Sequence, residues 1–256
     1  MRLSERIRRA MLRRLLPIPV EARHAEYSVI SSTDDDPAAP TPRLIEIAIE
    51  AIRHAQHASM DAICARMARP PHFANVWPGE NYKLLAGLML ALKPKLVVEV
   101  GTGGGSGTLA MRHAMPADAK LVTFDIVAWH AYPEHLLRAD DFADGRLVQH
   151  VADVSQPDVF PRYQSWFEQA DFFFIDAAKD GVLEFRLAER FGSMRFPKRP
   201  LMLFDDIRVW NMLRFWRSLP YPKLDLTSFG HWCGTGLIEW RAEAAAGAPA
   251  TSVKRA

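Results

Sequence analysis

The chain has 256 residues, of which 49% are hydrophobic and 24% charged, and its formal net charge is +2. This composition excludes a disordered or fibrous protein, and the length suffices for one large domain whose core needs no disulfide or metal. A charge so close to neutral gives no support for nucleic acid as a partner. Cys64 and Cys233 lie far apart in the sequence, as expected for two free thiols in a cytoplasmic protein.

Positive charge is concentrated at the start of the chain. Apolar residues are spaced between the arginines there, which predicts a short basic amphipathic helix. The arginines are Arg2, Arg6, Arg8, Arg9, Arg13 and Arg14. Such an arm suits a membrane surface, an acidic partner, or packing on the same or a neighbouring subunit, so a homodimer is one expectation. No apolar run is long enough for a membrane span, and we expect no transmembrane segment.

Composition divides the chain into three parts. Residues 31–40 are polar and rich in proline, which is typical of a linker. We therefore expect residues 1–40 to form the basic arm and linker, and residues 41–241 the main domain with N-terminal helices that cap it. Residues 242–256 are small and polar and are expected to form a flexible tail.

A helical extension precedes the main part of the domain. Thr41 can cap a helix that has Pro42 at its first position, where the missing N–H is harmless. Isoleucines and methionines then recur at helical spacing, from Ile45 to Met67, until two prolines end the pattern. We expect this extension to cover the site or to build a dimer contact. A second helix is predicted from about residue 80 to residue 92.

From residue 95 onward, short apolar runs alternate with helical stretches. Buried strands separated by helices predict a parallel sheet that is covered on both faces. The predicted strands are 96–100, 121–124, 147–150, 172–175 and 201–204, and two closing segments lie near 224–228 and 236–240. The closing segments have no room for a helix between them, which predicts an antiparallel hairpin. The expected fold is therefore a Rossmann-like, doubly wound α/β sheet, mainly parallel and seven-stranded.

A glycine-rich turn follows the first strand and opens a helix. Glycines let the backbone pass close to a ligand. The spacing Glu99, Gly101, Gly103, Gly105 is complete, whereas Ser106 stands where a dinucleotide fingerprint needs its third glycine. The pattern resembles motif I of class I methyltransferases, which implies that these five residues bind S-adenosylmethionine. An acid at the strand end suits a cationic amino-acid group and would repel a pyrophosphate. The alternative is a tight turn without a ligand.

Acids also end the next two strands. Asp125 follows the second strand, where a carboxylate can accept both ribose hydroxyls of a nucleoside, although it could instead cap a helix. Asp153 follows the third strand. By resemblance to the methyltransferases, its position implies contact with adenine.

Three more carboxylates follow the fourth and fifth strands. In a parallel sheet, Asp176, Asp205 and Asp206 emerge at the same edge as the glycine turn. Three converging carboxylates repel one another unless a cation lies between them, and an oxygen-only set suits Mg²⁺ or a similar divalent cation. Each acid could alternatively be a helix cap.

The segments 174–180 and 204–211 resemble motifs of the cation-dependent O-methyltransferases that act on catechols and caffeoyl-CoA. The resemblance implies that Asp176, Asp205 and Asp206 bind the cation and that Lys179 is the general base, with Asp176 sharing the catalytic role. Those enzymes usually have Asn at the position of Asp206. An Asp-Asp pair is closer to metal-dependent sugar O-methyltransferases, which generally lack the lysine.

The predicted function is methyl transfer from S-adenosylmethionine to a hydroxyl of a small molecule, assisted by a divalent cation. A bound divalent ion lowers the pKa of a hydroxyl, and Lys179 could take its proton if burial and the cation depress the lysine pKa. Trp129 or His231 could wall the acceptor site. A nicotinamide-dependent oxidoreductase and a non-enzymatic nucleoside-binding module are the alternatives. Phenol, sugar and polyketide hydroxyls all stay open as acceptors.

Overall fold

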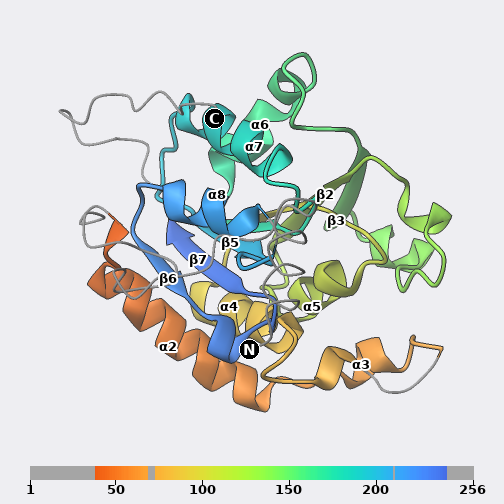
Figure 1. The fold of residues 1–256 in the computed structure, drawn as a ribbon. Helices are drawn as coiled ribbons and strands as arrows, with labels where there is room; N and C mark the ends of the chain where they lie inside the picture. The colour runs from red at the N-terminus through yellow and green to blue at the C-terminus, as the bar shows by residue number, and fades with distance from the viewer. Residues whose placement is uncertain (1–37, 69–72, 210, 241–256) are drawn as a thin grey trace, which may run out of the picture.

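A computed structural model describes residues 38–68, 73–209 and 211–240. It contains a seven-stranded sheet between two layers of helices (Figure 1). The strand order is β3-β2-β1-β4-β5-β7-β6, and β7 runs antiparallel to both of its neighbours. The strands are β1 Leu96–Val100, β2 Lys120–Asp125, β3 Leu147–Val151, β4 Phe172–Ile175, β5 Leu201–Asp205, β6 Lys223–Asp225 and β7 Thr235–Glu239. The predicted doubly wound sheet and its closing hairpin are confirmed.

Two apolar clusters, one on each face of the sheet, bind the helices to the strands. Successive strand residues alternate between them: Phe172 and Phe174 belong to one cluster and Phe173 to the other. The first cluster packs under α2 Pro42–His57, α3 Asp61–Cys64, α4 Tyr82–Leu92 and α5 Ser106–Ala114. The second packs under α6 Gln164–Gln169, α7 Leu183–Gly192 and α8 Met212–Ser218. Figure 1 shows α6, α7 and α8 on one side of the sheet and α2, α4 and α5 on the other.

Short 3-10 turns connect several of these elements. They are η2 Phe73–Asn75, η3 Trp129–Ala131, η4 Ala139–Phe142, η5 Phe160–Tyr163 and η6 Thr227–Phe229. Within the described ranges, none of the helices is long and apolar enough to cross a membrane.

The N-terminal extension begins as the sequence predicts, because Thr41 Oγ1 accepts a hydrogen bond from Leu44 N (3.2 Å). It is not one continuous helix, since α2 ends at His57 and α3 follows as a separate short turn. Its packing face is also not the isoleucine stripe: Ile45 and Ile49 are 40% and 47% exposed. The buried face consists of Leu44, Ala48, Ala51 and Ala55.

Small residues let α2 approach α4 closely. A Cβ atom added at Gly87 of α4 would lie 2.1 Å from the backbone oxygen of Ala51. A bulky side chain at this crossing would therefore force the helices apart, which explains why alanines and not isoleucines face the domain. The N-terminus of α2 is fixed by the buried Glu239 of β7, which accepts from Thr41 Oγ1 (2.7 Å) and Arg43 Nη1 (2.9 Å).

Candidate active site

The glycine turn joins β1 to α5 and is fixed by close backbone contacts. Gly101, Gly103 and Gly105 have φ of 103°, 49° and 90°, values that L side chains rarely adopt. A Cβ at Gly101 would lie 1.9 Å from the backbone oxygen of Asp176, so the turn passes directly against the end of β4. A Cβ at Gly103 or Gly104 would meet nothing within 4 Å. One side of the turn is therefore closed by β4, and the other side faces open space.

Glu99 lies beneath the turn, on the side of the sheet that α5 covers. It is 1% exposed, and its Oε2 accepts a hydrogen bond from Thr108 Oγ1 of α5 (2.5 Å). Burial raises the pKa of Glu99 to about 8, against the opposing effect of its hydrogen bonds to Thr108 and Thr123. In this arrangement Glu99 joins β1 to α5, a structural role that the sequence did not suggest. Its predicted contact with a cofactor is not tested by these contacts.

Asp125, at the end of β2, holds the turn from the neighbouring strand. Its Oδ2 accepts from Gly103 N (2.9 Å) and its Oδ1 from Val127 N (3.0 Å). Asp153, after β3, is engaged locally: it accepts from Ser155 Oγ (2.7 Å) and Gln156 Nε2 (2.6 Å). Asp125 therefore lies beside the turn, whereas Asp153 shapes its own loop.

The carboxylate cluster consists of Asp176, Asp205 and Asp206, at the ends of β4 and β5. Each of the three offers an oxygen atom within 4.8 Å of the others. The side chains of Asp205 and Asp206 are only 5% and 7% exposed. Among the described residues, none of the three accepts a hydrogen bond from a helix N-terminus: Asp180 performs that role for α7, through Val182 N (2.7 Å). Separate helix caps therefore do not explain the cluster.

Lys179 brings an ammonium group into the cluster. Its Nζ lies 3.0 Å from Asp176 Oδ1 and 3.9 Å from Asp205 Oδ2, and it contacts Asp206 Oδ2. Burial favours the neutral amine, but the three carboxylates outweigh burial and raise the pKa of Lys179. Partial burial and the neighbouring Asp205 raise the pKa of Asp176 to about 7. In the arrangement seen here, the lysine is a cation that neutralises the cluster.

His231, which the sequence suggested only as a wall of the acceptor site, is a member of the cluster's surroundings. Its Nδ1 lies 3.0 Å from Asp206 Oδ1 and 3.3 Å from Asp205 Oδ1, and its Nε2 lies 3.8 Å from Glu80 Oε2. The two aspartates raise the pKa of His231 to about 10, against the effect of burial. Burial raises the pKa of Glu80. Both residues reach the site through long-range contacts, because Gly79 N donates to the Gly230 carbonyl (2.9 Å).

Glu184 of α7, which no sequence motif marked, positions the loop that carries Lys179. Its two carboxylate oxygens accept from Lys179 N (2.9 Å) and Gly181 N (3.0 Å), and its side chain is buried. Lys179 has φ of 59°, and these bonds hold it in that left-handed conformation. The lysine's position is therefore set by the start of α7.

The remaining expectations concern the tryptophans. Trp129 N donates to Gln149 Oε1 (2.9 Å), and its ring stacks on Phe142 with centroids 5.5 Å apart. Trp232 is 72% exposed beside His231. Trp210, the basic arm and the C-terminal tail lie outside the described residues.

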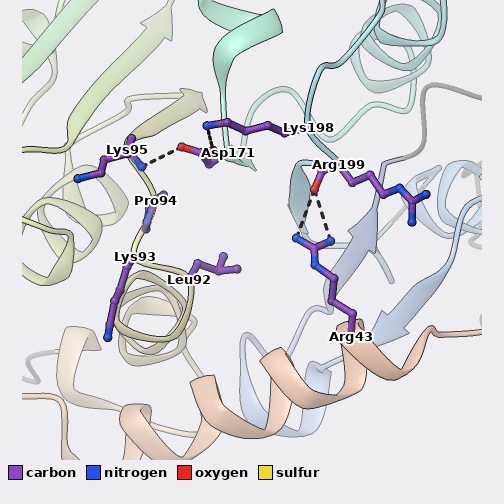
Figure 2. Close-up of a pocket in the computed structure, with 8 residues that line it drawn as sticks. All are labelled: Arg43, Leu92, Lys93, Pro94, Lys95, Asp171, Lys198 and Arg199. Carbon is purple, nitrogen blue, oxygen red and sulfur yellow. Dashed lines mark hydrogen bonds and ion pairs between the residues drawn. The ribbon is translucent and has the colours of Figure 1, made fainter.

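A separate pocket of about 200 Å³ lies at the opposite edge of the sheet, where β1, β4 and β5 begin (Figure 2). It is lined by Arg43, Leu92, Lys93, Pro94, Lys95, Asp171, Lys198 and Arg199. Its polar groups bond to one another: Asp171 accepts from Lys95 N and Lys198 Nζ, and Arg43 donates to the Arg199 carbonyl. None of the predicted site residues lies there.

Family models and curated protein sequences give no match to this chain. Solved structures, in contrast, do match it. A provisionally assigned caffeoyl-CoA O-methyltransferase from Staphylococcus aureus is 16% identical, with 77% of this chain and 100% of that chain covered and a TM-score of 0.50. The chain has the methyltransferase fold.

Other structures with the methyltransferase fold also match. A methyltransferase from Geobacter sulfurreducens is 19% identical, with 73% of this chain and 92% of that chain covered and a TM-score of 0.47. The O-methyltransferase TomG from Streptomyces achromogenes, crystallised with S-adenosylmethionine, is 16% identical, with 93% and 99% covered and a TM-score of 0.43.

Proposed function

We propose that this chain transfers a methyl group from S-adenosylmethionine to a hydroxyl oxygen of a small molecule, with a divalent cation at the carboxylate cluster. One observation carries the proposal: the glycine turn and the cluster lie against each other. Gly101 is packed on the backbone of Asp176, so a ligand above the turn would have the cluster beside it. The methyltransferase fold supports the same reading.

The open side of the turn fits the cofactor, which supplies an electrophilic methyl group on its sulfonium. Gly103 and Gly104 leave room for a ligand against the backbone. Ser106 begins α5 directly after the turn, and the free amides of a helix N-terminus are a common binding element for such ligands. Asp125, already bonded to Gly103 N, is placed to accept the ribose hydroxyls, and Asp153 is the candidate for the adenine edge.

The cluster fits a hard divalent cation. Its ligands would be Asp176, Asp205 and Asp206, all of them oxygen donors, which is the set that Mg²⁺ prefers. When bound, such a cation would polarise the acceptor hydroxyl and lower its pKa. The residues around the cluster would then hold that oxygen in line with the methyl group.

Lys179 Nζ is the group placed to take the acceptor's proton. It is held as an ammonium by the three carboxylates, so it can act as a base only when another cation neutralises them. A requirement for both the lysine and a divalent cation therefore follows from the charges at the site.

The first experiment is calorimetry with S-adenosylhomocysteine and, separately, NAD. Binding of the first and not the second supports the proposal, and the reverse result supports an oxidoreductase. Methyl transfer to a panel of phenols, sugars and polyketides is then measured with and without EDTA. We expect EDTA to abolish activity and Mg²⁺ to restore it.

The second experiment uses Asp205→Ala. We expect this variant to lose turnover while S-adenosylhomocysteine binds nearly as before, because Asp205 belongs to the carboxylate cluster at the end of β5 and not to the glycine turn. Asp118→Ala, at an exposed carboxylate before β2, is the matched control and should keep full activity. Normal turnover by Asp205→Ala would refute the cation site.

A further inference from the structure

The two adjacent aspartates of the cluster present their oxygens to two different sides. On one side, Oδ2 of Asp206 contacts Lys179 Nζ, and Oδ2 of Asp205 lies 3.9 Å from the same nitrogen. On the other side, both Oδ1 atoms face His231 Nδ1, at 3.0 Å from Asp206 and 3.3 Å from Asp205. Lys179 and Asp176 therefore share one side of the pair, and His231 occupies the other.

The His231 side holds a buried ion pair. Asp205 Oδ1, Asp206 Oδ1 and His231 Nδ1 are all buried, and the imidazole faces the two carboxylates at ion-pair distance. Both aspartate side chains are more than nine-tenths buried, and their Oδ1 atoms point at the imidazole. A divalent cation that replaced the proton shared in this ion pair would bind the same three atoms.

A thiol completes a donor set on this side. Ligand atoms of Asp206, His231 and Cys233 all lie within 4.8 Å of one another. Zn²⁺ binds carboxylate oxygen and imidazole nitrogen at about 2.0–2.2 Å and thiolate sulfur at about 2.3 Å. Donors in a tetrahedral arrangement around such an ion are separated by about 3.3–3.8 Å, so the three donors seen here need only small side-chain movements to share one ion.

Backbone contacts hold these donors in place. Arg208 N, just after β5, donates to the Cys233 carbonyl (3.0 Å), and Gly234 N donates to the His231 carbonyl (2.9 Å). His231 N donates to Thr235 Oγ1 (2.8 Å). Gly234 has φ of 114°, and a Cβ there would lie 2.8 Å from Arg208 N. The turn between His231 and Thr235 is therefore fixed against the end of β5.

Glu80 supplies an outer partner for the histidine. Its Oε2 lies 3.8 Å from His231 Nε2, on the opposite edge of the ring from the aspartates. A carboxylate behind the ring is the usual arrangement for a metal-binding histidine, because it fixes the tautomer and the ring orientation.

From this geometry we propose a second cation site, with Asp206, His231 and Cys233 as ligands and Zn²⁺ or a similar divalent transition ion as its occupant. Imidazole and thiolate donors favour such ions over Mg²⁺, which prefers oxygen. The site shares Asp206 with the oxygen-only set but lies on the other side of the aspartate pair, and it does not require methyl transfer.

Cobalt titration of the full chain tests this site, because Co²⁺ bound to a thiolate gives a charge-transfer absorption. Cys64→Ser leaves Cys233 as the only thiol in the chain. We expect Cys64→Ser and the unchanged chain to show the absorption, saturating at one Co²⁺ per chain and disappearing when Zn²⁺ is added. Cys233→Ser should lose it. Circular dichroism checks that each variant is folded.

Two further variants separate this site from the oxygen-only one. Asp176→Asn should keep the cobalt absorption, because Asp176 lies on the Lys179 side. Glu80→Gln should weaken Co²⁺ binding by about 10- to 100-fold, the usual cost of losing an outer partner. Absence of the absorption from the unchanged chain, or its persistence in Cys233→Ser, would overturn the inference. A cobalt site in a chain that transfers no methyl group would leave the inference standing and remove the proposed function.

Discussion

Two statements about the glycine turn can be tested separately with single alanine substitutions: that it packs against β4, and that the cofactor lies over it. In Gly101→Ala, the new methyl group would lie 1.9 Å from the backbone oxygen of Asp176, and φ would have to stay near 103°. The disfavoured backbone costs about 1–3 kcal/mol, and the overlap with rigid backbone costs about as much again. We therefore expect the free energy of unfolding to fall by about 2–6 kcal/mol. For a chain of this size, the melting temperature drops by roughly 2–4 °C for each kcal/mol.

Gly104→Ala is the matched comparison. A Cβ there meets nothing within 4 Å, and the φ of Gly104 is not left-handed, so stability should be unchanged or higher by up to about 1 kcal/mol. Its methyl group would instead enter the space assigned to the cofactor and should weaken S-adenosylhomocysteine binding roughly tenfold or more. Urea unfolding followed by tryptophan fluorescence and calorimetry measure the two effects.

Each variant tests a different one of the two statements. If Gly101→Ala unfolds within about 1 kcal/mol of the unchanged chain, the turn does not pass against β4 as described. If Gly104→Ala binds S-adenosylhomocysteine as tightly as the unchanged chain does, the cofactor does not lie over the turn.

Two further predictions concern buried glutamates. Glu184 accepts hydrogen bonds from two backbone amides, and Glu184→Gln would turn an NH₂ donor toward one of them. Hydrogen exchange at Lys179 N and Gly181 N should therefore quicken by about 10- to 100-fold. The control is Glu189→Gln, at an exposed position on the same helix, which should leave this exchange unchanged. Burial raises the pKa of Glu99 to about 8, so the folded chain keeps a proton that the unfolded chain releases above about pH 4.5. The contribution of Glu99 to the free energy of unfolding should therefore be fully present below about pH 4.5 and be lost as the pH rises toward 8. Glu99→Gln should remove that decline in urea titrations; a decline unchanged in the variant would contradict it.

The sheet could be predicted from the sequence because its strands are buried on both faces. Runs such as Phe172–Ile175 are apolar without interruption, and their alternation with helical stretches is typical of a covered parallel sheet. The acids at the strand ends then follow from geometry, since parallel strands end at one edge. The sequence alone therefore predicts that Asp176, Asp205 and Asp206 lie close together.

The parts that were not predicted depend on contacts distant in sequence. Isoleucines and alanines both recur at helical spacing in α2, and only the close approach to Gly87 decides that the alanines pack inward. Glu80 and His231 meet because the segments that carry them pair at Gly79 and Gly230. The charge state of Lys179 likewise follows from three carboxylates that converge only in the folded chain.

Backbone strain at the carboxylate cluster supports the proposed role of the cluster in the reaction. Lys179 and Asp206 have φ of 59° and 56°, which costs an L residue about 1–2 kcal/mol, and glycine at either position would relieve it. Both positions instead carry charged side chains that contact each other. Lys93 has a similar φ, but it ends α4, where that conformation is ordinary. A glycine turn alone serves a nicotinamide cofactor as well as a sulfonium one. A strained lysine and aspartate facing two more carboxylates suit an acceptor hydroxyl that must lose its proton, which the glycine turn by itself does not provide for.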